Sequence, residues 1–179
     1  MKIYIALLRG INVSGQKKVP MGELRSILTS VGFDNVNTYI QSGNVVFESK
    51  ENNTAFLEAL ISDKIKVAFG FEVPVLVKNR TEFKSIFKSN PFANVEAIAR
   101  KQVYFVLLKN TPEKELVKLL STEVYTNEDF KITANCVYLH CKTGYGKAKL
   151  NNNLVERKLK VEATARNYAT MVKLLEMSA

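Results

Sequence analysis

Two short segments place glycine beside polar side chains at the end of an apolar run. They cover residues 7–13 (Leu-Leu-Arg-Gly-Ile-Asn-Val) and residues 39–45 (Tyr-Ile-Gln-Ser-Gly-Asn-Val). Glycine lets a backbone approach a ligand closely, and ligands tend to bind where a few polar groups converge. Arg9 carries a planar set of donors that suits phosphate or carboxylate, and Asn12 and Asn44 could orient such a group. The chemistry predicted for these residues is anion binding.

A third segment adds cations near the end of the chain. Residues 144–149 (Gly-Tyr-Gly-Lys-Ala-Lys) join a flexible backbone to Lys147 and Lys149. Backbone N–H groups in glycine-rich turns can surround an anion. The spacing fits neither a P-loop nor a dinucleotide fingerprint, so an ordinary basic turn is the alternative interpretation.

A fourth segment, residues 164–167 (Thr-Ala-Arg-Asn), is interpreted as the start of a helix. Thr164 would cap this helix and Arg166 would lie in its first turn. A cation there opposes the helix dipole by roughly 0.3–1 kcal/mol. We therefore expect an anion beside Arg166, either a ligand or the carboxylate of Glu162.

Residues for acid–base or nucleophilic catalysis are few. His140 is the one histidine, and it stands late in an apolar strand, where we expect a satisfied core or edge side chain. No Ser or Cys lies in a nucleophile motif. Tyr4, Tyr104 and Tyr138 fall on strands and could stack on bases, but the motif typical of RNA-binding sheets is absent and a core position is the favoured interpretation. Whether the protein is an enzyme stays open.

Charge favours an anionic partner. The 179 residues carry a formal net charge of +9. The excess lies at the two ends, with six Lys and Arg against three Asp and Glu in residues 1–50, and eight against three in residues 140–179. Such an imbalance is typical of proteins that bind nucleic acid or other anions.

Cysteine spacing and hydropathy bear on disulfides, metal sites and the expected cellular location. Cys136 and Cys141 lie five positions apart in a strand-like run, which separates them by roughly 16 Å and places them beyond disulfide reach. With a single histidine, a Cys/His metal site is not expected, and no cofactor is predicted. No apolar run approaches the roughly 20 residues of a membrane helix, and no signal peptide is apparent. We expect a cytoplasmic protein with no membrane partner.

Apolar periodicity predicts an α+β fold. Strands at 2–8, 36–41, 45–48 and 73–78 alternate with helices at 20–32 and 56–68, which is the ferredoxin-like order βαββαβ. The run at 103–109 resembles the run at 3–9, one hundred residues earlier. It is followed by a helix around 116–120, a strand at 134–139, a helix around 154–159, a short strand at 161–163 and a final helix at 166–177.

The sequence therefore predicts a tandem repeat of two ferredoxin-like subdomains plus a C-terminal helix. The first half covers residues 1–79, a connecting helix and loop cover 80–101, and the second half with its helix covers 102–179. The first strand is apolar on both faces, with Ile5 and Leu7 on one and Tyr4 and Leu8 on the other. Because a sheet covered on one side normally has a polar second side, we expect the two halves to pack together as one compact unit.

Four of these stretches resemble one bacterial family. Residues 7–13, 38–47, 90–92 (Asn-Pro-Phe) and 164–170 are similar to the family of domain of unknown function 1697 over essentially the whole chain. The resemblance implies a two-part, ferredoxin-like α+β architecture and a shared polar set, but no reaction. The family favours Ser where this chain has Ala148, which argues against a nucleophile there. Gly-Gly is usual where this chain has Ser14-Gly15, and Thr-Arg-Asn-Trp where it has Ala-Arg-Asn-Tyr at 165–168.

Three hypotheses follow from the sequence. In the first, the protein is a binding module for a nucleotide, a phosphorylated metabolite or nucleic acid. In the second, it is an enzyme that acts on a phosphorylated small molecule, and in the third the polar motifs are purely structural. The oligomeric state stays open. The predicted ligand-binding residues are Arg9, Asn12, Ser42, Asn44, Lys147, Lys149, Arg166 and Asn167.

Overall fold

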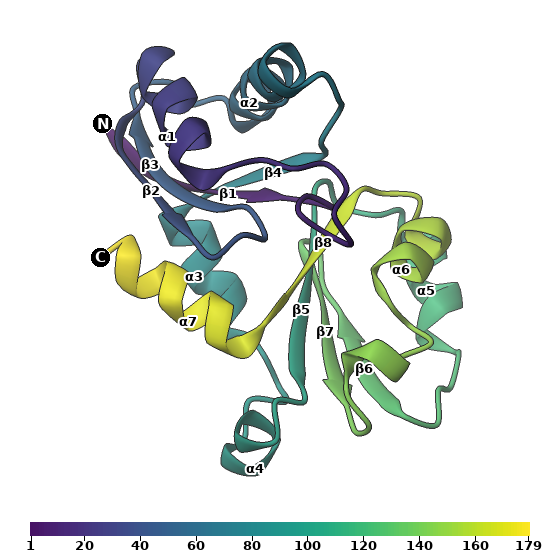
Figure 1. Ribbon diagram of the computed structural model, residues 1–179. Coiled ribbons are helices and arrows are strands. Elements are labelled where there is room, and N and C mark those ends of the chain that lie inside the picture. The colour runs from purple at the N-terminus through teal and green to yellow at the C-terminus, as the bar shows by residue number, and fades with distance from the viewer. The chain divides into compact units, whose positions relative to one another are not determined.

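The computed structural model describes residues 1–179, which divide into two compact units. The first unit comprises Met1–Ser85 and Lys173–Ala179, and the second comprises Ile86–Val172. The division at residue 85 lies inside the segment that the sequence analysis treated as a connector. Figure 1 follows both units along the chain by colour. None of the helices is long and apolar enough to cross a membrane.

The first unit is built on a four-stranded antiparallel sheet with the order β2-β3-β1-β4. Its central strand β1 pairs with β3 on one side and with β4 on the other. The elements are β1 (Lys2–Leu8), α1 (Met21–Ser30), β2 (Asp34–Tyr39), β3 (Asn44–Ser49), α2 (Thr54–Phe69), β4 (Val75–Asn79) and the start of α3 (Arg80–Lys88).

Helices α1 and α2 cover one face of this sheet (Figure 1). Tyr4 and Leu8 of β1 belong to the same buried cluster as Leu24 of α1 and Ile61 of α2. Local chemistry sets the ends of α2. The side chain of Asn53 accepts hydrogen bonds from the first backbone N–H groups, as N-cap residues do.

The second unit repeats this arrangement on a sheet with the order β6-β7-β5-β8. Helices α5 and α6 cover one face of it, where Leu120 and Leu159 pack with Val106 and Leu139 of the central strands (Figure 1). The elements are α4 (Val95–Ala99), β5 (Val103–Leu108), α5 (Lys114–Ser121), β6 (Glu128–Ile132), β7 (Cys136–Cys141), a single 3₁₀ turn (Tyr145–Lys147), α6 (Asn152–Leu159), β8 (Ala163–Asn167) and α7 (Tyr168–Met177), which ends in the first unit.

The predicted mixed α+β class is confirmed, with two four-stranded antiparallel sheets of the same strand order. The ends of the two central strands also match. The backbone N–H of Leu8 donates to the carbonyl of Gly43, and that of Leu108 donates to the carbonyl of Asn135, each at 2.8 Å. The two leucines stand one hundred positions apart.

The structure corrects the sequence analysis between residues 161 and 177. The last strand does not end at residue 163 but continues to Asn167, and α7 begins only at Tyr168. Arg166 pairs with Phe105 in the β5–β8 ladder, so it lies in a strand and not in the first turn of a helix. The helix-dipole argument for an anion beside Arg166 is therefore wrong. The run Ala-Thr-Ala-Arg-Asn has little apolar alternation, so its strand pairing could not be seen in the sequence.

Strand β6 was also not predicted. Its residues, Glu-Asp-Phe-Lys-Ile, lie at the edge of the second sheet and pair with β7 alone. Edge strands are short and charged in many proteins, since charge discourages pairing with other chains. A short charged run of this kind gives a weak periodic signal.

Gly43 occupies a position where no side chain fits. Its φ is +82°, and a Cβ atom built there would lie 2.6 Å from Cβ of Leu8 and 2.8 Å from Cδ1 of Ile11. Both neighbours are buried, so they cannot move aside freely. The glycine in the second motif is therefore required by close packing against the first motif.

We predict that Gly43→Ala lowers the free energy of unfolding by about 2–5 kcal/mol, since it adds left-handed strain to overpacking. Urea denaturation followed by circular dichroism would measure this loss. Gly10→Ala is the matched control, because Gly10 also has a positive φ (+71°) but nothing within 4 Å of the added atom. Gly10→Ala should lower the free energy of unfolding only through left-handed backbone strain, by about 1–2 kcal/mol. Equal losses in the two variants would contradict the packing argument.

Candidate functional site

Asn12 joins the two glycine motifs of the first unit. It has a positive φ of +54°, which asparagine tolerates better than most residues. Its Nδ2 donates to the carbonyls of Val19 (3.0 Å) and Gln41 (2.7 Å), and its Oδ1 accepts from the N–H of Val19 (2.8 Å). The side chain thus ties the loop after β1 to the turn between β2 and β3.

Asn44 and Ser42 stabilise that turn from inside. Asn44 is fully buried, and its Nδ2 donates to the carbonyl of Tyr39 (3.0 Å) and to Oγ of Ser42 (3.1 Å). The backbone N–H of Arg9 donates to the carbonyl of Pro74 (3.1 Å), which joins the same sheet edge to β4. The structure therefore brings the four predicted residues of this unit to one end of the sheet, where the side chains of Asn12 and Asn44 bond to backbone.

The four predicted residues of the second unit have different surroundings. Lys147 and Lys149 are exposed, and Lys147 ends the 3₁₀ turn. Nη1 of Arg166 donates to the carbonyl of Ala165 (2.8 Å), and burial lowers the pKa of this guanidinium to about 10, so it stays protonated at pH 7. Oδ1 of Asn167 accepts from the N–H of Thr170 (2.8 Å) and so caps α7. As ligand contacts, these residues remain predictions.

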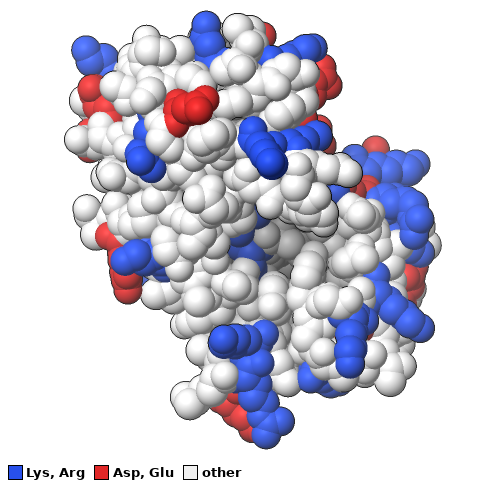
Figure 2. All heavy atoms as spheres, viewed as in Figure 1, with Lys and Arg blue, Asp and Glu red and all other residues white.

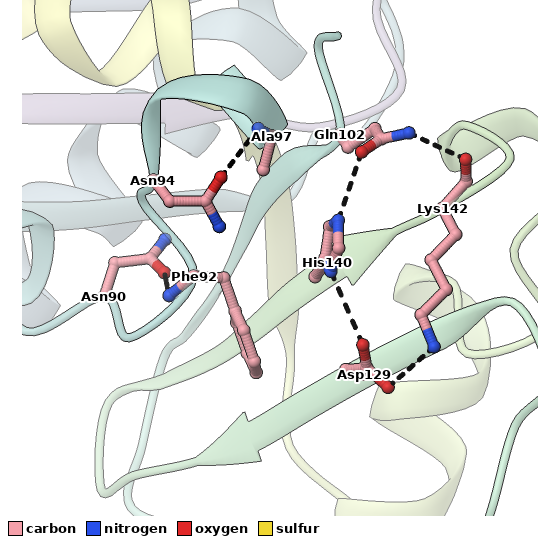
Figure 3. Close-up of polar contacts among 8 residues, drawn as sticks. All are labelled: Asn90, Phe92, Asn94, Ala97, Gln102, Asp129, His140 and Lys142. Carbon is pink, nitrogen blue, oxygen red and sulfur yellow. Dashed lines mark hydrogen bonds and ion pairs between the residues drawn. The ribbon is translucent and has the colours of Figure 1, made fainter. Parts of the chain in front are cut away.

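A polar cluster around His140 of β7 was not predicted (Figure 3). Its Nδ1 lies 3.4 Å from Oδ2 of Asp129 on β6, and its Nε2 lies 3.1 Å from Oε1 of Gln102, just before β5. Nε2 of Gln102 donates to the carbonyl of Lys142 (2.8 Å), and Nζ of Lys142 lies 3.0 Å from Oδ1 of Asp129. The four residues form a closed ring of contacts.

Both acceptors that flank His140 have fixed orientations. Asp129 presents a carboxylate oxygen, and Gln102 presents its carbonyl oxygen because its amide nitrogen is committed to Lys142. A neutral imidazole carries one N–H and can satisfy only one of these acceptors, whereas an imidazolium donates to both. The arrangement therefore offers an oxygen acceptor to each ring nitrogen of His140.

The Asn-Pro-Phe segment shapes the surroundings of this ring (Figure 3). Oδ1 of Asn90 accepts from the N–H of Phe92 (2.8 Å), which fixes a tight turn. The ring of Phe92 then stacks on His140, with 6.2 Å between centroids. Asn94 caps the short helix α4 through the N–H of Ala97 (2.8 Å).

A recess of about 310 Å³ opens between α4 and the end of β7. Besides His140, it is lined by two cations and one carboxylate, Arg100, Lys142 and Glu96, and by Asn94, Ala97 and Gln102. Glu96 pairs with Arg100 at 2.9 Å, but both side chains are well exposed (75% and 65%). Sequence reasoning missed this site because its residues come from three separate segments. The only available signal was the lone histidine near a strand end.

On the face shown in Figure 2, Lys and Arg form several small groups separated by uncharged atoms rather than one large patch. No group of three or more His, Cys, Asp or Glu side chains is arranged to hold a metal ion. Local recesses are therefore better candidates for a binding site than a broad basic surface.

The comparisons with known proteins establish the family. The fold defines a mixed α+β protein with two antiparallel sheets. Within that class, the chain belongs to DUF1697, a protein family of unknown function, and the family model matches residues 1–138. The segment at 164–170 and His140 lie beyond the matched residues. A solved structure of a conserved bacterial protein from Streptococcus pneumoniae is similar, with 21% identity, a TM-score of 0.73 and 99% of each chain covered. At this identity the likeness concerns the fold alone. No curated protein matches the chain.

We predict that Asn12→Ala lowers the free energy of unfolding by about 2–4 kcal/mol. The change removes three hydrogen bonds and places alanine at a positive φ. Thermal or urea unfolding would measure the loss. Asn110→Ala is the control, because Asn110 is exposed and lies in the corresponding loop of the second unit. If Asn12→Ala is as stable as the unmodified protein, Asn12 becomes a candidate ligand contact again.

We also predict that both cysteines are inert in the folded protein. Cys136 and Cys141 are buried and form no disulfide, and burial, with a smaller contribution from Glu128, raises the pKa of Cys141 to about 12. Since the thiolate is the reactive form, a thiol reagent at pH 8 should label neither residue until denaturant is added, when both should react. Rapid labelling of the native protein would show that this part of the second sheet opens readily.

Proposed function

We propose that this protein is a binding module for a small anionic ligand, and that the recess beside His140 takes the charged group. The single observation that supports this most directly is the pair of cations, Arg100 and Lys142, that line one recess together with the imidazole of His140.

The ion pairs already present around the recess do not compete strongly with a ligand. The Arg100–Glu96 pair is exposed, and exposed pairs contribute only about 0.2–1 kcal/mol. An oxyanion that enters the recess could bind Arg100 side-on while Glu96 turns toward solvent. Lys142 shares Asp129 with His140, so its ammonium group also has donors left over.

The size of the recess limits the ligand. About 310 Å³ lies near the lower end of ordinary ligand pockets, which range from about 300 to 1,000 Å³. This volume suits the phosphate or carboxylate of a metabolite or nucleotide. It suits duplex nucleic acid less well, because a duplex is bound over an extended surface.

The structural hypothesis accounts for part of the predicted site. Asn12, Ser42 and Asn44 of the first unit bond mainly to backbone or to one another. We infer that the glycine motifs serve chiefly to close the sheet edge. We also infer that both units are copies of the ferredoxin-like βαββαβ arrangement. The shared strand order and the matching hydrogen bonds of Leu8 and Leu108 support this inference.

We predict that sulfate binds in this recess and that Arg100→Gln weakens the binding about tenfold, because the variant removes one of the two cations of the lining. Isothermal titration calorimetry would measure the affinity.

Two variants make the experiment specific. Lys142→Gln removes the second cation of the recess and should weaken sulfate binding to a similar degree. Lys118→Gln removes one positive charge from an exposed position on α5, outside the recess, and should bind like the unmodified protein. Sulfate binding that neither Arg100→Gln nor Lys142→Gln weakens would place the anion elsewhere.

A further inference from the structure

A second recess, of about 420 Å³, lies in the first unit. It is found where β1 begins and where β4 passes into α3, and Tyr4 pairs with Asn79 in the ladder beside it. The full lining consists of Met1, Lys2, Ile3, Tyr4, Asn52, Asn79, Arg80 and Thr81. It contains cationic and amide side chains and no carboxylate.

Arg80 has an unusual environment in this recess. Its Nε is buried and has no hydrogen-bond partner. Glu51 and Glu82, which adjoin the lining residues Asn52 and Thr81 in the sequence, have other partners. Glu82 pairs with Lys78 at 2.9 Å, and Oε1 of Glu51 accepts from the backbone N–H groups of Asn52 and Asn53, each at 2.7 Å.

A buried donor without a partner is costly. Leaving a buried polar group unpaired costs about 1–3 kcal/mol, and more when the group is charged. A guanidinium can bind an oxyanion side-on, through Nε–H and one Nη–H at once. Since the buried Nε is closed to solvent, a ligand in the recess pairs it only when the guanidinium turns toward the recess. An oxygen ligand would then satisfy Nε and neutralise the charge of Arg80 together.

The neighbouring groups suit the same ligand. Lys2 adds a second positive charge to the lining, and the amide of Asn52 can donate to a further oxygen. Asn79 caps α3 by accepting from the N–H of Glu82 at 2.9 Å, which fixes the backbone that carries Arg80. The recess also has the volume of an ordinary small-molecule pocket.

We propose that this recess is an anion site for the phosphate group of a small phosphorylated molecule. Arg80 binds two phosphate oxygens side-on, Lys2 neutralises the remaining charge, and Asn52 orients the group. The site lies in the first unit and shares no residue with the recess beside His140, so it does not depend on the function proposed above.

The test is a calorimetric titration with pyrophosphate in the Arg100→Gln/Lys142→Gln background, which removes the two cations of the other recess. We expect saturable binding that falls at least tenfold in Arg80→Gln. Arg80→Lys should bind pyrophosphate about as weakly as Arg80→Gln, because a lysine cannot bind side-on through two N–H groups. Lys84→Gln is the charge-matched control, since Lys84 is an exposed residue on the same helix and lies outside the recess. It should leave the affinity unchanged.

A second measurement separates a ligand role from a structural one. If Arg80 serves a ligand, Arg80→Gln should melt at the same temperature as the parent or higher without pyrophosphate, and should lose the rise in melting temperature that pyrophosphate gives the parent. A large fall in the melting temperature without ligand would identify a structural arginine and overturn the proposal.

Two further outcomes would also overturn the proposal. One is pyrophosphate binding that Arg80→Gln leaves intact. The other is an absence of pyrophosphate binding together with Arg80-dependent, salt-sensitive binding of a single-stranded RNA, because that result would point to a nucleic-acid surface. Failure of the function proposed for the His140 recess would appear separately, as sulfate binding that Arg100→Gln and Lys142→Gln leave unchanged.

Discussion

The close approach of Gly43 to Leu8 is the constraint on which the first sheet depends. A Cβ atom at residue 43 would lie 2.6 Å from Cβ of Leu8, so the turn before β3 can lie against the end of β1 only if it carries a glycine. The backbone bond from Leu8 to Gly43 and the Asn12 bonds to Val19 and Gln41 then fix the surrounding loops. These contacts explain why the two glycine motifs occur together in one chain without requiring a ligand.

In the second unit, the ends of the equivalent strands meet without a glycine. Leu108 donates to the carbonyl of Asn135, so the backbone bond is retained while the residue that provides the carbonyl differs. The same sheet framework thus tolerates different side chains at its edge. Such freedom allows one unit to use its polar residues for structure while the other places His140 and Gln102 in the wall of a recess, with Asp129 behind His140 as its partner.

Much of the fold could be predicted from the sequence, whereas the candidate sites could not. The strands and helices with strong apolar periodicity, such as β1, β5 and α2, lie within a few residues of their predicted positions. The failures, β6 and all of β8 after Ala163, are polar strands whose pairing depends on a neighbour far along the chain. The His140 site depends on β6, since Asp129 is the direct ladder partner of His140. Because β6 was not predicted, the contact between Asp129 and His140 could not be predicted either.

Net charge along the sequence was a poor guide to where an anion would bind. The largest excess of Lys and Arg lies in residues 140–179, but many cations there are exposed, and Lys158 is already paired with Glu123 at 2.6 Å. Exposed and paired charges attract a ligand weakly, because solvent and counter-ions screen them. Arg80 lies in a segment with almost no net charge, yet its Nε is buried without a partner. The state of pairing of a cation, which only the folded chain determines, is what makes it available to an anion.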